Sequence, residues 1–520
     1  MRRRVIARLA PWDEMRADFA WDIPARFNIA RACCDDWAAE DPERVAIVDL
    51  SAGRDVWRYG RLKDASDRLA GGLAARGVGP GDRVAILLPQ RAEVMVAHLA
   101  AMKLGAVALP LFALFGPEAL DYRLRDSGAV AVIADADGLG KLDGLDLPAL
   151  AHRVDVARLA DWLGDPVECA DTAAEDPAMM IYTSGTTGTP KGVLHAHRFL
   201  WGHLPCVETA LEGFPRPGDV GWTPADWAWI GGLMDLAMPC LFYGVPLVAR
   251  RFAKFEPAAA WELMVAERVT AAFLPPTALK MLRRTEAPDG LALRAVMSGG
   301  EALGAGLLDW GREALGVPIN EIYGQTECNL VMAACAGTQD VVPGTLGRAV
   351  PGVEIELQDA AGRPVGEGET GEICTRGSPA TFLRYWMKPE QTAAKWRAGW
   401  LRTGDLGRLG SGGTITYVSR DDDVITSAGY RIGPTEIETC LTAHPRVVMA
   451  AVVGLPDPDR GEAVTAFVVP EGETAGLEAE LVAWVKARLS PHMAPRAVRF
   501  VAALPMTATG KIQRRSLRES

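Results

Sequence analysis

The chain lacks the features that mark several special classes of protein. No uncharged apolar stretch reaches the roughly 18–20 residues that a membrane-spanning helix requires. The 54 glycines and 35 prolines show no period of three, which excludes a collagen-like chain. Hydrophobic residues make up 49% of the 520 positions and charged residues 23%, which excludes intrinsic disorder. The length suits about three globular domains, or one large domain with a small one.

Cysteine motifs and an excess of basic charge are also absent. The nine cysteines include no CxxC motif, which excludes a zinc ribbon and a thioredoxin-like redox site. The 55 basic and 66 acidic residues leave a formal charge of −11, which disfavours nucleic acid or an anionic membrane as the main partner. The basic opening residues are followed at once by acidic ones rather than by the long apolar run of a secretory signal. We predict a cytoplasmic protein with reduced thiols.

Helix-like and strand-like segments alternate in the first part of the chain. Apolar residues recur at helical spacing over 61–76 and 93–104, whereas 83–88 and 106–111 are short apolar runs typical of buried strands. This alternation predicts an α/β fold of layered subdomains with largely parallel strands.

The pattern changes in the last third of the chain. Glycine-rich turns separate short strand-like runs between 344 and 417, which predicts a β-rich subdomain. The last hundred residues indicate a compact α+β unit, with a helix that begins at Pro434 and a strand over 447–453. The charged run at 419–423 lies between these two regions.

A domain boundary follows from this change of pattern. We predict a large N-terminal domain over 1–421 and a small, mobile α+β domain over 422–520.

The most informative segment is 180–192, which reads MIYTSGTTGTPKG. A short apolar run enters a loop of small hydroxyl residues, three glycines and Lys191. Such a loop can present backbone N–H groups and hydroxyls to phosphate oxygens, and the lysine adds a point charge. It is not the P-loop of nucleotide hydrolases, because GxxxxGK[ST] is required there and Gly192 follows Lys191 here.

The segment TSGTTGTPKG resembles the signature of the adenylate-forming (AMP-binding) superfamily. The resemblance covers about 42–515, and it is greatest to medium-chain and acetyl-type acyl-CoA synthetases. Five further blocks occur in the order that this superfamily shows: Ser298-Gly299-Gly300-Glu301, Tyr323-Gly324-Gln325-Thr326-Glu327, Thr403-Gly404-Asp405, RDDDVITSAGYR over 420–431, and Thr509-Gly510-Lys511.

The resemblance implies a two-step ligase reaction. A carboxylic acid and ATP form an acyl-adenylate and pyrophosphate, and coenzyme A then gives acyl-CoA and AMP. A substrate carboxylate is anionic at pH 7 and needs no general base, which fits the absence of a Ser–His–Asp triad or paired carboxylates. The histidines His195 and His197 are therefore expected to be structural. ATP, CoA and Mg²⁺ are the implied cofactors.

The resemblance also implies the residues that bind the nucleotide and the metal. Thr326 is expected at the α-phosphate as a catalytic residue, and Glu327 as a catalytic residue that holds Mg²⁺. The others are expected at the β- and γ-phosphates (Thr183, Ser184, Gly185, Thr186, Thr187, Gly188, Thr189, Pro190, Lys191), around the adenine (Gly300, Glu301, Ala302, Glu321, Ile322, Tyr323, Gly324, Gln325) and at the ribose (Asp405, Arg420).

The C-terminal blocks are implied to serve both half-reactions. Lys511 is the expected catalytic lysine between the carboxylate and the α-phosphate, although the basic residues after it would by themselves indicate a solvated tail. Asp422 matches the hinge about which the small domain rotates. After rotation, the residues expected at the coenzyme A are Ala428, Gly429, Tyr430, Arg431 and Arg460.

The acyl pocket is implied to lie between two segments, with Trp229, Ile230, Gly231, Gly299 and Gly324 as its residues. Acetate-specific relatives carry Trp and Val where this chain has Gly324 and Gly299, which predicts added space unless other residues refill it. Trp227 and Trp229 are expected on the opposite wall. We predict a C3–C8 acid, short- to medium-chain or branched, with cyclic acids included.

Other functions remain open on the sequence alone. They are an acetate–CoA ligase, an adenylating enzyme that loads a carrier protein, a luciferase, and a nucleotide-binding protein without activity. Asp226 and Asp235 lie in the region where amino-acid adenylation domains hold the amino group of their substrate. No sequence feature identifies the oligomeric state.

Overall fold

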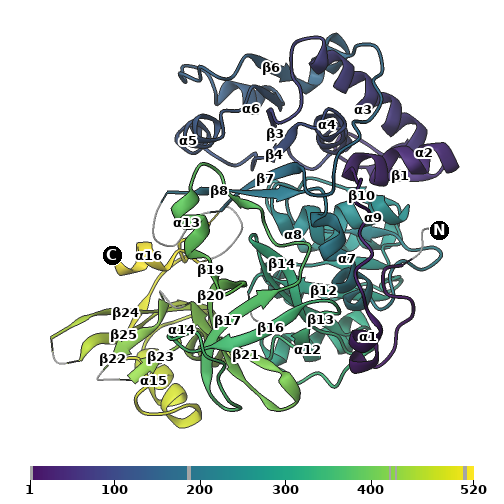
Figure 1. The fold of residues 1–520 in the computed structure, drawn as a ribbon. Helices are drawn as coiled ribbons and strands as arrows, with labels where there is room; N and C mark the ends of the chain where they lie inside the picture. The colour runs from purple at the N-terminus through teal and green to yellow at the C-terminus, as the bar shows by residue number, and fades with distance from the viewer. Residues whose placement is uncertain are drawn as a thin grey trace.

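The computed structural model describes residues 4–183, 189–301, 303–420, 423–427, 430–458, 460–507 and 512–519. The chain forms four β-sheets with helices packed around them (Figure 1). Two large sheets come from the first 350 residues or so, except for one edge strand at 384–385; a smaller antiparallel sheet follows, and the fourth sheet belongs to the C-terminal region. This is the mixed α/β fold, with a large N-terminal part and a smaller C-terminal part, that the sequence predicts.

The first large sheet carries the predicted phosphate loop. Its inner strands β3, β4, β5 and β7 are parallel and almost wholly buried, as expected for a sheet covered on both faces. Its strand order is β18 (Arg384–Tyr385), β8 (Lys191–Ala196), β7 (Pro177–Thr183), β4 (Val107–Pro110), β3 (Arg83–Leu87), β5 (Ala131–Ala134), β6 (His152–Asp155).

The second large sheet has nine strands, and its parallel centre is extended by antiparallel strands at both edges. Its strand order is β15 (Arg348–Ala349), β14 (Cys328–Ala334), β13 (Ile319–Gln325), β12 (Ala295–Gly299), β11 (Ala271–Phe273), β9 (Gly221–Trp222), β10 (Leu247–Ala249), β1 (Val45–Asp49), β2 (Asp55–Arg58).

The two remaining sheets are smaller. The third is antiparallel and contains β16 (Glu354–Gln358), β17 (Thr370–Arg376), β20 (Trp400–Leu409), β19 (Trp396–Arg397) and β21 (Ile415–Arg420). The fourth contains β23 (Tyr430–Ile432), β22 (Ile425–Ser427), β25 (Gly461–Pro470), β24 (Val447–Asp457) and β26 (Ala497–Phe500).

The helices connect the strands and cover the sheets. No helix among the described residues is both long and apolar enough to cross a membrane. The α-helices are α1 (Trp12–Asp18), α2 (Asp36–Glu40), α3 (Tyr59–Ala74), α4 (Ala92–Lys103), α5 (Pro117–Ser127), α6 (Ala136–Gly140), α7 (Phe199–Ala210), α8 (Ile230–Gly232), α9 (Met238–Tyr243), α10 (Pro257–Ala266), α11 (Pro276–Leu282), α12 (Ala305–Trp310), α13 (Pro389–Ala394), α14 (Pro434–Thr442), α15 (Leu477–Arg488) and α16 (Arg514–Arg518). Shorter π- or 3₁₀-helical turns are η1 (Arg31–Asp35), η2 (Val156–Trp162), η3 (Leu233–Ala237), η4 (Gly311–Leu315) and η5 (Ser411–Gly413).

The segments predicted from periodicity have the expected structure. The helices predicted over 61–76 and 93–104 correspond to α3 and α4, and the intervening strands β3 and β4 are parallel. The glycine-rich region 344–417 contains strands β15 to β21. Helix α14 begins at Pro434, where the fixed φ of proline suits a first helical turn.

The C-terminal region has hydrophobic cores of its own. One buried cluster draws its residues only from 425–498, and a second only from 451–517. The three clusters of the preceding region reach no further than Ile415 among their buried members. Helix α14 nevertheless contacts β21 (Figure 1, yellow beside green). This separation of cores supports the predicted boundary at 421/422, which stays a prediction.

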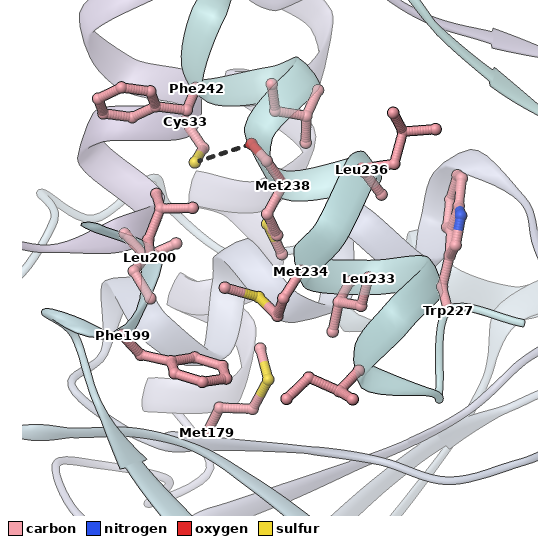
Figure 2. Packing of buried hydrophobic residues seen from close by; sticks show 14 of the residues in the cluster. Cys33, Met179, Phe199, Leu200, Trp227, Leu233, Met234, Leu236, Met238 and Phe242 are labelled. Carbon is pink, nitrogen blue, oxygen red and sulfur yellow. Dashed lines mark hydrogen bonds between the residues drawn. The ribbon is translucent and has the colours of Figure 1, made fainter. Parts of the chain in front are cut away.

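The core of the large unit encloses the segment that leads to the acyl pocket. Figure 2 shows Met234 of the 233–243 helical segment pointing toward Phe199 and Leu200 of α7, whereas Leu236 lies on the other side of the segment. Trp227 lies in the same core and is almost fully buried. Leu233 to Ala237 form a π-helical turn, and such turns often occur at functional sites.

Candidate active site

The predicted phosphate loop joins two antiparallel neighbours, β7 and β8. Thr183 is the last residue of β7 and faces Lys191, the first residue of β8, across the hairpin. The Tyr122 hydroxyl donates to the Pro190 carbonyl at 2.9 Å, and the Tyr182 hydroxyl donates to Asp126 Oδ2 at 2.6 Å. These bonds tie both ends of the loop to helix α5. Thr189 also lies in the described part of the loop.

Tyr385 connects the loop lysine to the predicted metal ligand. Strand β18 pairs with β8, which places Tyr385 opposite Val193. The Tyr385 hydroxyl donates to Glu327 Oε1 at 2.6 Å, and Lys191 Nζ lies 4.9 Å from the centre of the Tyr385 ring. Burial lowers the pKa of Lys191, and the nearby Glu327 carboxylate opposes that shift. Two predicted site residues, more than a hundred positions apart, therefore meet around one tyrosine.

Asp405 is held by donors from three directions. The Tyr323 hydroxyl donates to Asp405 Oδ2 at 2.7 Å, and the Gln325 amide donates to the same oxygen. Arg420 lies opposite Asp405 across β20 and β21, with a guanidinium nitrogen 3.2 Å from Oδ1. Burial and the Asp405 charge raise the pKa of Tyr323 well above its ordinary value, so its hydroxyl remains a donor.

The two segments predicted at the adenine are tied together. The Leu303 backbone N–H donates to Glu321 Oε1 at 3.2 Å, and burial raises the pKa of Glu321 to about 8. Ile322 follows Glu321 on β13 and is buried. Glu301 pairs with Lys280 at 3.5 Å between Nζ and Oε2. Glu301 and Leu303 directly precede α12, and Ile322 also lines the pocket described below.

A cavity of about 40 Å³ lies beside this cluster. Its walls include aromatic rings, with the centre of the Trp229 ring 5.5 Å from that of Phe273. Trp229 also covers two glycines, since a Cβ atom on Gly231 or Gly300 would lie 2.9 or 3.2 Å from its ring. All five predicted acyl-pocket residues line the cavity, together with Thr326: Trp229, Ile230, Gly231, Gly299 and Gly324.

The expected free space beside Gly324 and Gly299 is not there. A Cβ atom on Gly324 would lie 2.4 Å from the Leu330 backbone nitrogen and 2.7 Å from Asn329 Oδ1. A Cβ atom on Gly299 would lie 2.6 Å from the Ile322 carbonyl oxygen. Close-packed neighbouring atoms, most of them backbone, therefore lie beside both glycines, and there is no open volume at either position.

Trp227 was expected on the pocket wall together with Trp229, and this is wrong. Trp227 points into the core, whereas Trp229, two residues later, lines the cavity. The two acidic residues of the region, Asp226 and Asp235, also differ in whether they line the cavity. Asp235 lines the cavity, whereas Asp226 accepts a hydrogen bond from the Ala228 backbone at 2.8 Å and is not among the lining residues.

Two of the predicted C-terminal site residues, Tyr430 and Arg460, lie on the surface of their unit. Tyr430 is 53% exposed and stacks on His492 with ring centres 4.4 Å apart. Arg460 is exposed in the turn between β24 and β25. Arg431 belongs to β23. The predicted site residues Ser184, Gly185, Thr186, Thr187, Gly188, Ala302, Asp422, Ala428, Gly429 and Lys511 lie outside the described residues.

The basic residues near the C-terminus are not all a solvated tail. Arg514 pairs with Glu438 at 2.7 Å and with Asp423 at 3.4 Å, and Arg518 pairs with Asp423 at 2.9 Å. Asp423 and Glu438 are both buried. Helix α16 is thus fastened to the start of its own unit, close to the predicted hinge.

Sequence reasoning missed Tyr385, Asn329 and Asp126. Strand pairing brings Tyr385 and Asn329 to the site, whereas Asp126 lies on helix α5 and is connected to it by the hydrogen bond from Tyr182. The buried histidines were expected to be structural, and burial lowers the pKa of His197 to about 4 and that of His195 well below its ordinary value. Both rings are therefore neutral at pH 7.

Comparison with known proteins decides the family. A family model described as AMP-binding enzyme matches residues 34–386, and one described as AMP-binding enzyme C-terminal domain matches residues 436–511. The chain belongs to the AMP-binding enzyme family. It is 31% identical to the human mitochondrial acyl-coenzyme A synthetase ACSM4 over 96% of this chain and 91% of that protein.

Two further relatives agree with this assignment. An acetyl-coenzyme A synthetase of Bacillus subtilis is 31% identical over 98% of this chain and 93% of its own length. The crystal structure of the anthranilate CoA ligase AuaEII in complex with anthranoyl-AMP superimposes with a TM-score of 0.88 at 27% identity, covering 96% of this chain and 98% of that one. This AMP-binding enzyme is an acid–thiol ligase that consumes ATP and coenzyme A and releases AMP.

Proposed function

We propose that the acid is compact, with three to eight carbons, and that branched and cyclic acids are included. The cavity of about 40 Å³ beside Thr326 carries this proposal. One water needs roughly 10–15 Å³ of such volume, so the cavity suits about three to four heavy atoms beyond the carboxylate. Within the proposed range, the smaller members and branched C4–C5 acids fit best.

Adenylation needs no general base from the protein. One carboxylate oxygen of the acid attacks the α-phosphorus of ATP, and the bond to pyrophosphate breaks. The protein offsets negative charge and positions the reactants, as in phosphoryl transfer generally. Thr326 contacts the α-phosphate, the 183–191 loop with Lys191 binds the β- and γ-phosphates, and Lys511 bridges the acid and the α-phosphate.

Asp405 binds the ribose. A carboxylate offers about four lone-pair positions, and Tyr323, Gln325 and Arg420 occupy three of them. One ribose hydroxyl can therefore bind directly. The second binds when Gln325 or Arg420 gives up its position. Glu301 and the segment from Glu321 to Tyr323 flank the adenine.

Glu327 and Thr326 suit a Mg²⁺ ion that is shared with the nucleotide. No group of three or more His, Cys, Asp or Glu side chains that could hold a metal occurs in the part of the chain that the structure describes. Mg²⁺ typically uses one or two carboxylates, waters and substrate phosphates, and one glutamate with a hydroxyl neighbour matches that donor set. When bound, the ion neutralises charge on the phosphates.

The second step uses the small domain. The thiol of coenzyme A attacks the acyl carbon, and the bond to AMP breaks. Rotation about Asp422 brings Ala428, Gly429 and Tyr430 to the thiol, and Arg431 and Arg460 contact phosphates and the coenzyme. The exposure of Tyr430 and Arg460 in this structure leaves both free to make these contacts. The cytoplasm remains the predicted location.

A panel of acids tests this proposal. We expect CoA-dependent AMP release to peak among C3–C5 acids in a comparison of acetate, propionate, butyrate, isobutyrate, 2-methylbutyrate, octanoate and benzoate. A peak at octanoate contradicts the compact pocket, and a peak at acetate identifies an acetate–CoA ligase. Acid-dependent pyrophosphate exchange without any CoA-dependent product favours an enzyme that loads a carrier protein.

A further inference from the structure

The lining of the acyl cavity includes a buried carboxyl group without a cationic partner. Asp235 lies on η3 and is 4% exposed, and it is the one charged residue among the described residues that line the cavity. Burial raises its pKa well above the ordinary value, and a hydrogen bond from Asn329 opposes that shift. A buried charge of this kind is costly unless a partner is supplied.

The hydrogen bonds around Asp235 can be assigned donor by donor. His203 Nδ1 lies 2.8 Å from the Phe199 carbonyl oxygen, which only accepts, so Nδ1 carries the proton. Burial lowers the pKa of His203 to about 4, so the ring is neutral and its Nε2 is an acceptor. Asn329 Nδ2 lies 3.0 Å from that Nε2 and must donate to it.

Asn329 donates its second amide proton to Asp235 Oδ1. Both protons of that amide are then used, and the neutral His203 ring, 3.9 Å from Asp235 Oδ1, has no proton to offer. Asp235 Oδ2 accepts no hydrogen bond from any described residue. It is also absent from the described buried polar atoms that lack a partner, which means that it contacts accessible volume.

Gly324 is what allows this arrangement. Its missing side chain lets the Asn329–Leu330 backbone lie against β13, and Leu330 adopts a left-handed φ of 54° there. The space that a larger side chain would occupy is used to bring the Asn329 amide to Asp235. The cavity is thus lined by the aromatic rings of Trp229 and Phe273 together with one carboxyl acceptor, Asp235.

We propose that the acyl pocket contains a polar subsite, where Asp235 accepts a hydrogen bond from a hydroxyl or amino group of a compact acid. Asn329 and His203 are positioning residues that orient the Asp235 carboxyl group. The inference rests on the proposed function and narrows its substrate class from plain hydrocarbon acids to hydroxy- or amino-substituted ones. A plain acid leaves Oδ2 buried without a partner, and this costs free energy. A site built for hydrogen bonding therefore discriminates strongly against an acid that lacks the bonding group.

The experiment compares matched acids in the full-length enzyme. Initial rates of AMP release with ATP, Mg²⁺ and CoA give kcat/KM for butyrate against its 2-, 3- and 4-hydroxy and amino derivatives, and for isobutyrate against 3-hydroxyisobutyrate. We expect the best substituted acid to exceed its parent by at least roughly 10²-fold. Hydroxy acids suit either protonation state of Asp235, whereas amino acids require the carboxylate.

Two variants assign the effect to Asp235. Asp235→Leu should lower the ratio of substituted to plain acid at least tenfold and raise the activity with the plain acid. Asp235→Asn should reduce activity with amino acids more than with hydroxy acids, because the charge is lost and an acceptor oxygen is kept. Asp226→Asn is the matched control, because Asp226 is a carboxyl group of the same segment outside the cavity, and it should leave the ratio unchanged.

The possible failures are distinguishable. Thermal unfolding and ATP binding show whether each variant is folded. If wild type prefers the plain acids, or if folded Asp235→Leu keeps the wild-type ratio, the polar subsite is refuted while the ligase function stands. If no carboxylic acid supports AMP release in wild type, the proposed function itself fails.

Discussion

The large unit and the C-terminal unit prepare their parts of the active site in different ways. In the large unit the site residues already hold one another, with Asp405 bound by three donors and Glu327 by Tyr385. In the small unit Tyr430 and Arg460 lie exposed, and the ion pairs of Asp423, Glu438 and Arg514 stay within the unit. The site residues of the large unit are therefore preassembled for binding. Those of the small unit reach the site only when that unit moves.

Lys511→Ala should have the largest effect, because it should separate the rates of the two half-reactions. Removing one charge-stabilising donor should slow acyl-AMP formation by at least roughly 10²–10³-fold. Conversion of preformed acyl-AMP and CoA to acyl-CoA should continue, because that step uses the other arrangement of the small unit. Quench-flow measurement of both half-reactions checks this, and an equal loss in both would contradict the role of Lys511.

Gly429→Leu should have the opposite effect. A leucine side chain would block the approach of the thiol, since glycine at that position permits close backbone contact. Thioester formation should fall by roughly 10²-fold or more, as displacements of about 1 Å at a reacting centre already do. Adenylation should be nearly unchanged. Normal CoA turnover in this variant would refute the proposed rotation about Asp422.

Tyr385→Phe tests whether the hydrogen bond to Glu327 in the large unit contributes to nucleotide binding. The ring that faces Lys191 is kept, and the hydroxyl that donates to Glu327 is lost. Hydrogen bonds to charged groups contribute about 1.5–3 kcal/mol, so the apparent affinity for ATP with Mg²⁺ should fall about tenfold or more. Titration calorimetry measures this. Tyr59→Phe is the matched control, because the Tyr59 hydroxyl donates to the Leu241 carbonyl, outside the predicted nucleotide site.

Glu321→Gln should change the pH dependence of stability. The folded-state pKa of Glu321 is raised to about 8 from an ordinary value of 4.5. The neutral acid therefore stabilises the fold fully below about pH 4.5, and this contribution is lost as pH rises through about 8, at up to about 1.4 kcal/mol per pH unit. The Tm of wild type relative to the variant should fall between pH 5 and pH 9. A constant difference would show that Glu321 is ionised throughout.

Sequence reasoning predicted the layered α/β architecture because its helices and buried strands have strong local periodicity, as α3, β3 and α4 show. It also indicated residues that the structure gathers at one site, since Tyr323, Gln325, Asp405 and Arg420 belong to motif blocks. It could not predict Tyr385, because the β18–β8 pairing spans about 190 residues. It misjudged the space at Gly324, because an absent side chain does not reveal which backbone packs against it.

One measurement tests most directly whether two units share one site for two half-reactions. Wild-type enzyme is mixed with a C4 acid and ATP without CoA, and samples are withdrawn and quenched at intervals. CoA is then added to the unquenched remainder, which is sampled in the same way. We predict one equivalent of acyl-adenylate and one of pyrophosphate per site before CoA is added, and acyl-CoA with AMP only afterwards. Acyl-CoA formation with ADP and phosphate as products, or no acyl-adenylate with any acid that gives acyl-CoA, would contradict the account.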